Sequence, residues 1–138
     1  MANKQYLIVI DEEKSTRTAA LAIITRLFGN SVKVVGASTF DGTDILGSEI
    51  IFIGCNKPSP ESFSYFEEVL KHINLSTRKC ALFSTSPKNG VQAIRYLENL
   101  IRDSEVKLCC KSIITRNIAR LQMWVSNILK GEIEKNAE

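Results

Sequence analysis

Five short apolar runs constrain the fold of this 138-residue chain more than any other feature of its sequence. They span residues 6–10, 32–37, 50–54, 80–85 and 106–110. Most of them show little alternation between apolar and polar residues, and each has the length of a strand. Such runs are typical of strands that are covered on both faces, as in a parallel sheet.

Helical patterns separate most of these runs, and we expect helices over residues 16–28, 59–73, 90–102 and 116–130. The second opens with Ser59-Pro60-Glu61, which combines a capping serine, a proline at the first helical position and an acid in the first turn. Segment 39–47 leaves room for at most one turn of helix. Gly131 is expected to end the last helix.

Strands that alternate with helices predict right-handed crossovers and a doubly wound α/β fold. We therefore expect a three-layer α/β/α sandwich with a five-stranded parallel sheet in the order 2-1-3-4-5. Residues 1–131 are expected to form this single domain, because 138 residues suit one core, and 132–138 to form a polar C-terminal tail.

Composition narrows the classes of partner. A net charge of +3 is too small to predict nucleic-acid binding. The apolar run near the N-terminus has only five residues, so we expect no signal peptide, no membrane span and a cytoplasmic protein. The four cysteines (Cys55, Cys80, Cys109 and Cys110) lack metal-binding spacing, and His72 is the one histidine, so no metal site is predicted.

In folds of this kind, ligands bind beyond the carboxyl ends of the strands, near the switch point of the strand order. This predicts a crevice formed by loops 11–16, 55–60 and 84–90. The order of motifs resembles the flavodoxin-like family, in particular its short-chain members, through SEIIFIGCNKP and FEEVLKHINLSTRKCALFSTSP. The resemblance implies an electron carrier that holds FMN at these three loops.

The first loop departs from that family's phosphate loop, which reads roughly Ser/Thr-x-Thr-Gly-x-Thr. With Thr16 at the last position, Asp11, Glu13 and Lys14 replace the first hydroxyl, the second threonine and the glycine. One carboxylate about 5 Å from a phosphate costs on the order of 3 kcal/mol per unit charge at an effective dielectric near 20. The other two loops, CNKPSPES and STSPKNG, carry no aromatic residue to flank a flavin ring.

We therefore expect an eroded FMN site and no resident cofactor, with FMN binding as the alternative. If FMN binds, the resemblance implies two groups of contacts. They are Lys14, Ser15 and Thr16 at the phosphate, and Cys55, Asn56, Thr85 and Ser86 around the ring.

The stretch YLIVIDEEKSTRTAALAIITRLF also resembles the start of a response-regulator receiver domain. That resemblance implies a Mg²⁺ site at Asp11 and Glu12, with Thr85 and Lys111 in the places of two further site residues. The phosphate-accepting aspartate is missing, because the third strand ends in Gly54-Cys55-Asn56. A degenerate receiver-like regulatory domain is therefore a third alternative.

The function that the sequence favours is a non-catalytic binding, scaffold or accessory module that acts through a protein partner or self-association. An enzyme is disfavoured because no nucleophile, base and oxyanion set can be assembled from the sequence. Cys55 is interpreted as an inert thiol. Trp124 is left with two interpretations, the edge of the core or an interface anchor.

Overall fold

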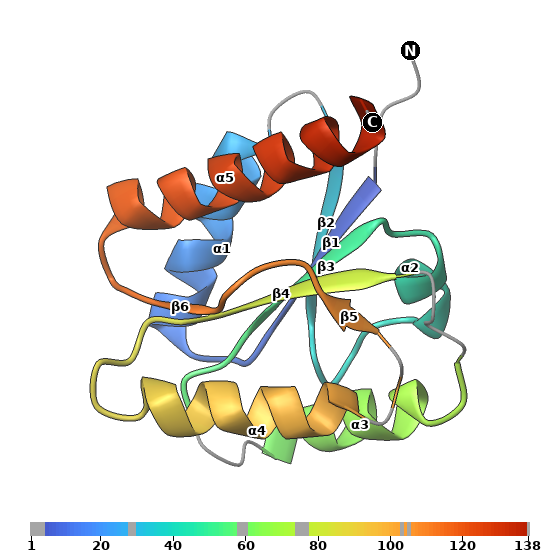
Figure 1. Ribbon diagram of the computed structural model, residues 1–138. Coiled ribbons are helices and arrows are strands. Elements are labelled where there is room, and N and C mark those ends of the chain that lie inside the picture. The colour runs from blue at the N-terminus through green and yellow to red at the C-terminus, as the bar shows by residue number, and fades with distance from the viewer. Residues whose placement is uncertain are drawn as a thin grey trace.

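The computed structural model describes residues 5–27, 30–57, 61–73, 78–102, 104 and 106–137. A parallel sheet lies between two layers of helices (Figure 1). Its strands are β1 (Gln5–Ile10), β2 (Ser31–Gly36), β3 (Ile50–Gly54), β4 (Lys79–Ser84), β5 (Lys107–Leu108) and β6 (Ile113–Ile114). The order is β2-β1-β3-β4-β5, with β6 also paired to β4, so the predicted order 2-1-3-4-5 is confirmed.

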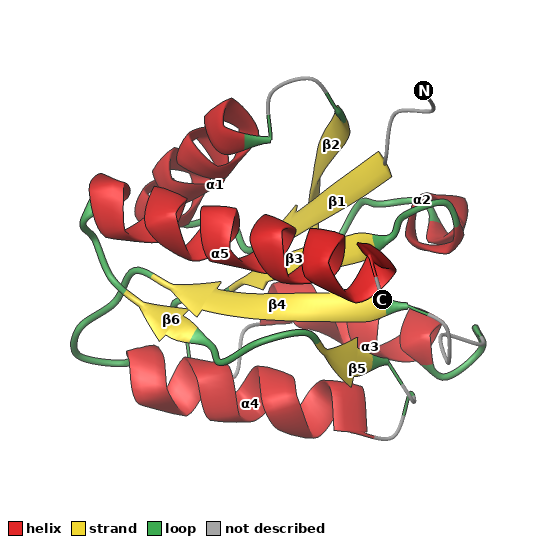
Figure 2. Ribbon diagram, turned by 45° about the horizontal axis from the view of Figure 1, so that its top comes forward, coloured by secondary structure: helices red, strands yellow, loops and turns green. Residues whose placement is uncertain are grey.

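The helices cover both faces of the sheet (Figure 2). On one face lie α1 (Lys14–Arg26) and α5 (Ile118–Ala137), and on the other lie α3 (Ser64–Leu70) and α4 (Gly90–Arg102). The short α2 (Gly42–Leu46) packs Ile45 into the core on the α3–α4 side, and the 3₁₀ turn η1 (Glu61–Phe63) precedes α3. The three-layer sandwich is therefore present.

Alternate side chains of the central strands enter two separate cores. In β1, Leu7 and Val9 pack toward α2, α3 and α4, whereas Ile8 and Ile10 pack toward α1 and α5. Both sides of the strand are apolar because both are buried, which explains the unbroken apolar runs. The edge strand β2 is an exception, since the side chain of Val34 is 37% exposed.

Trp124 lies at the edge of the core on the α1–α5 side. Its ring makes edge-to-face contacts with Phe52 and Phe83, at centroid distances of 6.0 and 6.3 Å. Its indole N–H donates to the carbonyl oxygen of Lys111 over 2.9 Å. Of the two interpretations of Trp124, the structure therefore supports the core edge.

Several boundaries differ from those predicted. The fifth strand is expected over 106–110. In its place the structure has two short strands, β5 at 107–108 and β6 at 113–114. The second predicted helix ends at Leu70 instead of residue 73, and its proposed start at Ser59 and Pro60 lies outside the described residues. The single turn expected within 39–47 is confirmed as α2.

The prediction that Gly131 ends the last helix is wrong, because α5 continues to Ala137. Glycine costs about 1 kcal/mol in a helix interior relative to alanine, but the residues that follow, Glu132, Glu134 and Lys135 among them, are good helix formers. Their combined propensity outweighs one glycine. Segment 132–137 is therefore a continuation of the helix and not an extended tail.

Gly54, at the end of β3, is required by its neighbour across the ladder, Phe83. A Cβ atom at position 54 would overlap the ring of Phe83, which is fully buried. We expect Gly54→Ala to lower the free energy of unfolding by about 1–3 kcal/mol, because the ring must move within a packed core. Urea denaturation measures this loss.

Gly131→Ala is the matched control for this substitution. A Cβ at position 131 would meet no atom of the described structure within 4 Å. Alanine is also the better helix former, so this variant should gain about 0.5–1 kcal/mol. Equal effects of the two substitutions would contradict the role assigned to the contact between Gly54 and Phe83.

Candidate functional site

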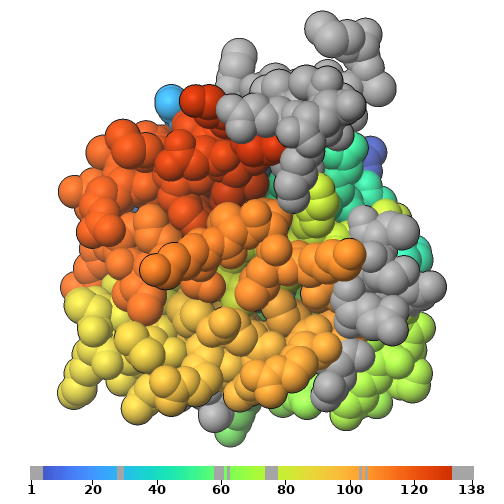
Figure 3. Space-filling view, viewed as in Figure 1, coloured from blue at the N-terminus to red at the C-terminus, as the bar shows by residue number. Residues whose placement is uncertain are grey.

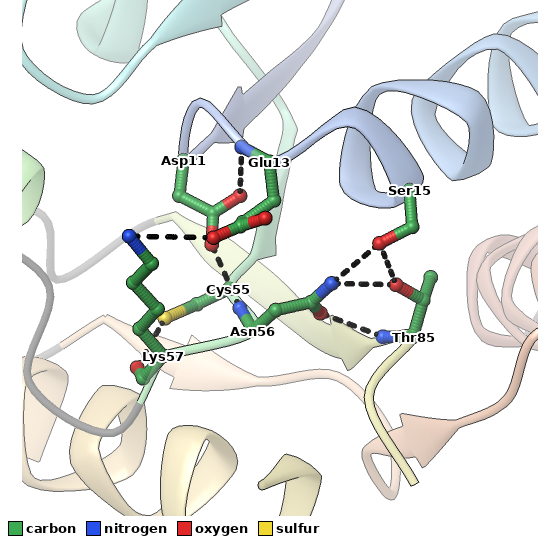
Figure 4. Close-up of polar contacts among 7 residues, drawn as sticks. All are labelled: Asp11, Glu13, Ser15, Cys55, Asn56, Lys57 and Thr85. Atoms are coloured by element: carbon green, nitrogen blue, oxygen red, sulfur yellow. Dashed lines mark hydrogen bonds and ion pairs between the residues drawn. The ribbon is translucent and has the colours of Figure 1, made fainter. Parts of the chain in front are cut away.

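The carboxyl ends of β1, β3 and β4 bring polar side chains from three loops together (Figure 4). Ser15 lies in the first turn of α1, Asn56 lies two residues after β3, and Thr85 directly follows β4. Parallel strands all end at the same edge of a sheet, so residues 29 to 70 positions apart in sequence meet here.

The side chain of Asn56 is the centre of this cluster. Its Nδ2 donates to Ser15 Oγ over 2.8 Å and to Thr85 Oγ1 over 2.7 Å. Its Oδ1 accepts from Ser84 Oγ and from the backbone N–H of Thr85, both over 2.9 Å. A carboxamide offers two N–H donors and two acceptor lone pairs, so Asn56 has no hydrogen-bonding capacity left for a ligand.

The hydroxyls of the cluster also bind one another. Thr85 Oγ1 donates to Ser15 Oγ over 2.9 Å, which closes a triangle of contacts with the Asn56 amide. Asn56, Ser84 and Thr85 are all less than a tenth exposed. The cluster therefore forms a compact plug made of the protein's own side chains.

Asp11 holds the first loop against the second. Its carboxylate is 4% exposed and accepts from the backbone N–H of Asn56 over 2.8 Å and from that of Glu13 over 3.2 Å. Glu13 forms an ion pair with Lys57 over 3.3 Å, and Glu12 is exposed. Asp11 and Glu13 thus connect the first loop to the second, and Glu12 points to the surface. The carboxylate of Asp11 lies buried beside the plug.

The other predicted site residues take different positions. Lys14 is exposed, and Thr16 is fully buried with an Oγ1 that has no partner among the described residues. Ser86 serves the turn into α4, where its Oγ accepts from the N–H of Asn89 over 3.0 Å. The structure therefore joins the side chains of Ser15, Asn56 and Thr85, and Ser86 meets this network only through its backbone N–H, which donates to Ser84 Oγ over 3.3 Å.

Cys55 does not face the crevice. Its side chain is fully buried in the core on the α2–α4 side, and its Sγ donates to the carbonyl oxygen of Lys57 over 3.0 Å. Burial raises the pKa of Cys55 to about 12, and the nearby carboxylate of Asp11 contributes to the rise. A thiol that stays protonated at neutral pH is a poor nucleophile, in agreement with its interpretation as inert.

The receiver-like arrangement is not assembled. Thr85 is bound to Asn56, and Lys111 lies between β5 and β6, where it lines a groove beside α4. The space at the end of β3 above Gly54 is taken by Phe83. Among the described residues, no group of three or more His, Cys, Asp or Glu side chains is placed to hold a metal ion.

The sequence does not predict two residues of the network as hydrogen-bonding partners. Ser84 falls in the fourth apolar run and at the start of the third predicted loop, and Asp11 is predicted as a metal ligand or as a source of repulsion. The sequence does contain one usable signal, since Ser84 and Thr85 end an apolar run and their hydroxyls need hydrogen-bond partners if they are buried.

No family model and no curated protein matches the sequence. Solved structures do match. A flavodoxin from Streptococcus pneumoniae TIGR4 has a TM-score of 0.77 at 15% identity, covering 91% of this chain and 97% of its own. Oxidised flavodoxin 2 from Bacillus cereus has a TM-score of 0.79 at 16% identity, covering 91% of this chain and 98% of its own.

A flavodoxin from the domain Archaea has a TM-score of 0.79 at 14% identity, covering 93% of this chain and 99% of its own. The fold is flavodoxin-like. At such low identities this likeness extends to the architecture alone. None of the helices in the described part of this flavodoxin-like chain has the length and apolar character needed to span a membrane.

The Asn56 network predicts a large stability effect from one amide. We expect Asn56→Ala to lower the free energy of unfolding by about 2–3 kcal/mol, because buried hydrogen-bonding groups of Ser84 and Thr85 lose their partner. Asn30→Ala is the control, since the part-buried side chain of Asn30 makes one hydrogen bond, to the carbonyl of Leu27. Its loss should stay below about 1 kcal/mol in urea denaturation.

Burial of Cys55 predicts a pH dependence of stability. The pKa in the folded protein is about 12 and the ordinary value is 9.0, so the folded state favours the neutral thiol. The contribution of the neutral Cys55 thiol to the free energy of unfolding is complete below pH 9 and is lost as the pH rises toward 12. The stability advantage of the wild type over Cys55→Ala should therefore shrink between about pH 8 and pH 10.5. A constant difference in urea midpoint would contradict this.

Proposed function

We propose that this chain is a flavodoxin-like binding module that works without FMN and contacts other proteins. One observation carries the proposal: the Asn56 side chain joins the three loops and has all its hydrogen bonds satisfied within the protein. A ligand that entered there would have to break these contacts before it made its own.

Electrostatics support the same conclusion. A flavin phosphate would approach the first loop, where Asp11 is nearly buried beside the plug and Glu12 and Glu13 follow directly. Two backbone N–H groups that an anion could use are already bound by the Asp11 carboxylate, those of Glu13 and Asn56. The loop therefore provides its own anion, and a second one would be repelled.

One observation favours a second candidate, an FMN-binding electron carrier. Thr16 lies in the first turn of α1, and its buried Oγ1 has no partner among the described residues. Buried hydroxyls are usually paired, so an unpaired one beside a helix N-terminus fits the phosphate contact that the family resemblance implies for Thr16. One hydroxyl offers a phosphate little compared with the repulsion from the three acids at residues 11–13, so we rank this candidate second.

An FMN titration separates the two candidates. Flavin fluorescence and melting temperature are followed together, and riboflavin is the control that lacks the phosphate. We expect neither saturable quenching nor a shift in melting temperature. An electron carrier would instead gain about 2.7 kcal/mol when FMN is at a hundredfold excess over its dissociation constant, which raises the melting temperature by several degrees.

Thr16→Val makes the titration sharper, because valine keeps the shape of threonine and removes the hydroxyl. If the crevice holds no ligand, this variant should be at least as stable as the wild type, since a buried hydroxyl without a partner is destabilising. If FMN binds through Thr16, the variant should lose the stabilisation that FMN gives to the wild type.

The proposed partner is another protein or a second copy of the chain, and the proposed compartment is the cytoplasm. All four cysteines lie within the described residues and all are free thiols, which suits a reducing compartment. Light scattering over a range of concentrations distinguishes self-association from a monomer that needs a different partner.

A further inference from the structure

The division of the fifth strand creates a bulge at the edge of the sheet. Lys107 and Leu108 of β5 pair with Lys79 and Cys80, and Ile113 and Ile114 of β6 pair with Phe83 and Ser84. Between these pairs, residues 81–82 of β4 lie opposite residues 109–112 of the edge strand. The edge strand therefore has two residues more than β4 over this stretch. This bulge consists of Cys109, Cys110, Lys111 and Ser112.

The bulge is held in place at several points. The N–H of Cys109 donates to the carbonyl of Cys80 over 2.9 Å, and that of Thr115 donates to the carbonyl of Ser84 over 2.9 Å. Between these points, the indole N–H of Trp124 donates to the carbonyl of Lys111. The bulge is thus an ordered part of the edge, on the surface between α4 and α5 (Figure 3).

A groove of about 350 Å³ lies between the bulge and α4. Its wall is apolar, formed by Val91, Ile94, Leu108 and Ile114, and Cys110 lines it. The charged residues along it are Arg95, Glu98 and Lys111, so cations outnumber carboxylates by one. Its size suits a small molecule that combines an apolar part with carboxylates.

The cysteines of the chain differ in pKa and in exposure. A hydrogen bond from the side chain of Cys109 lowers the pKa of Cys110 below the ordinary value of 9.0. Burial raises the pKa of Cys80, like that of Cys55, to about 12. Cys109 and Cys110 are both partly exposed, whereas Cys55 and Cys80 are fully buried, and of the four only Cys110 lines the groove. Thiolate character and access therefore coincide at Cys110.

We propose that Cys110 is a site of reversible S-thiolation by a small anionic disulfide, whose carboxylates bind Arg95 and Lys111 in the groove. The Cys110 thiolate attacks one sulfur of the disulfide, and a new S–S bond forms as the old one breaks. The other half leaves as a thiolate with the electron pair and takes a proton from water. The Cys110 sulfur is oxidised and the leaving sulfur is reduced; a small thiol reverses the step.

The product is a mixed disulfide and not a bond between Cys109 and Cys110. Adjacent Cα atoms are 3.80 Å apart across a trans peptide, whereas disulfides normally join Cα atoms about 4.4–6.8 Å apart. Closing a ring between neighbours would strain the backbone of the bulge. This inference does not depend on the proposed function, since the groove lies along the edge strand and not at the three loops.

In the test, the reduced protein is incubated at about pH 7.5 with oxidised glutathione, which is the small anionic disulfide used as the probe. Intact-mass spectrometry and peptide mapping follow the product. We expect one glutathionyl group, located on Cys110. The Cys110→Ser variant should lose this glutathionylation, and the Cys109→Ser variant should retain it. Equal modification of Cys109 and Cys110, or unchanged glutathionylation of the Cys110→Ser variant, would overturn the proposal.

Arg95→Gln tests the anionic part of the proposal, with hydroxyethyl disulfide as a neutral reagent of the same chemistry. We expect the variant to react up to about fivefold more slowly with oxidised glutathione and at an unchanged rate with the neutral reagent. An unchanged rate with glutathione would overturn the role of the cation. Equal slowing with both reagents would also overturn it, because that result indicates a structural effect.

Discussion

The amide of Asn56 joins three loops that come from distant parts of the chain, and the rest of the site depends on it. Ser15 belongs to the first crossover, Asn56 to the third and Thr85 to the fourth, so the contacts exist only when β1, β3 and β4 are in register. A buried polar network of this kind is costly when it is partly satisfied and stabilising when it is complete. Here it is complete at Asn56, whose amide has all its hydrogen-bonding groups paired within the protein.

Two further contacts extend this arrangement. The carboxylate of Asp11 accepts a hydrogen bond from the backbone N–H of Asn56, and Phe83 fills the space above Gly54, two residues before Asn56. A polar contact and an apolar one thus fix the same segment.

Much of the fold could be predicted because both cores are apolar along every central strand. The strand order and the bounds of α4 follow from these runs and from helical spacing. The division of the fifth strand could not be predicted, since Val106 to Cys110 reads as continuous and the bulge depends on where Ile113 and Ile114 pair with β4. For the site, the sequence placed Ser15, Asn56 and Thr85 near one another, but their mutual hydrogen bonds depend on side-chain directions that no pattern encodes.

The divided strand also affects how the protein avoids unwanted association. Long, flat edge strands are templates on which other chains can add strands and aggregate. A bulge with two extra residues breaks the β5–β6 edge into two-residue pieces, which are too short to template a foreign strand. The opposite edge, β2, keeps six residues in register, and there the exposed ammonium of Lys33, paired with Asp44, provides the charge that discourages strand addition. The two margins of one sheet are thus protected by different means, one geometric and one electrostatic.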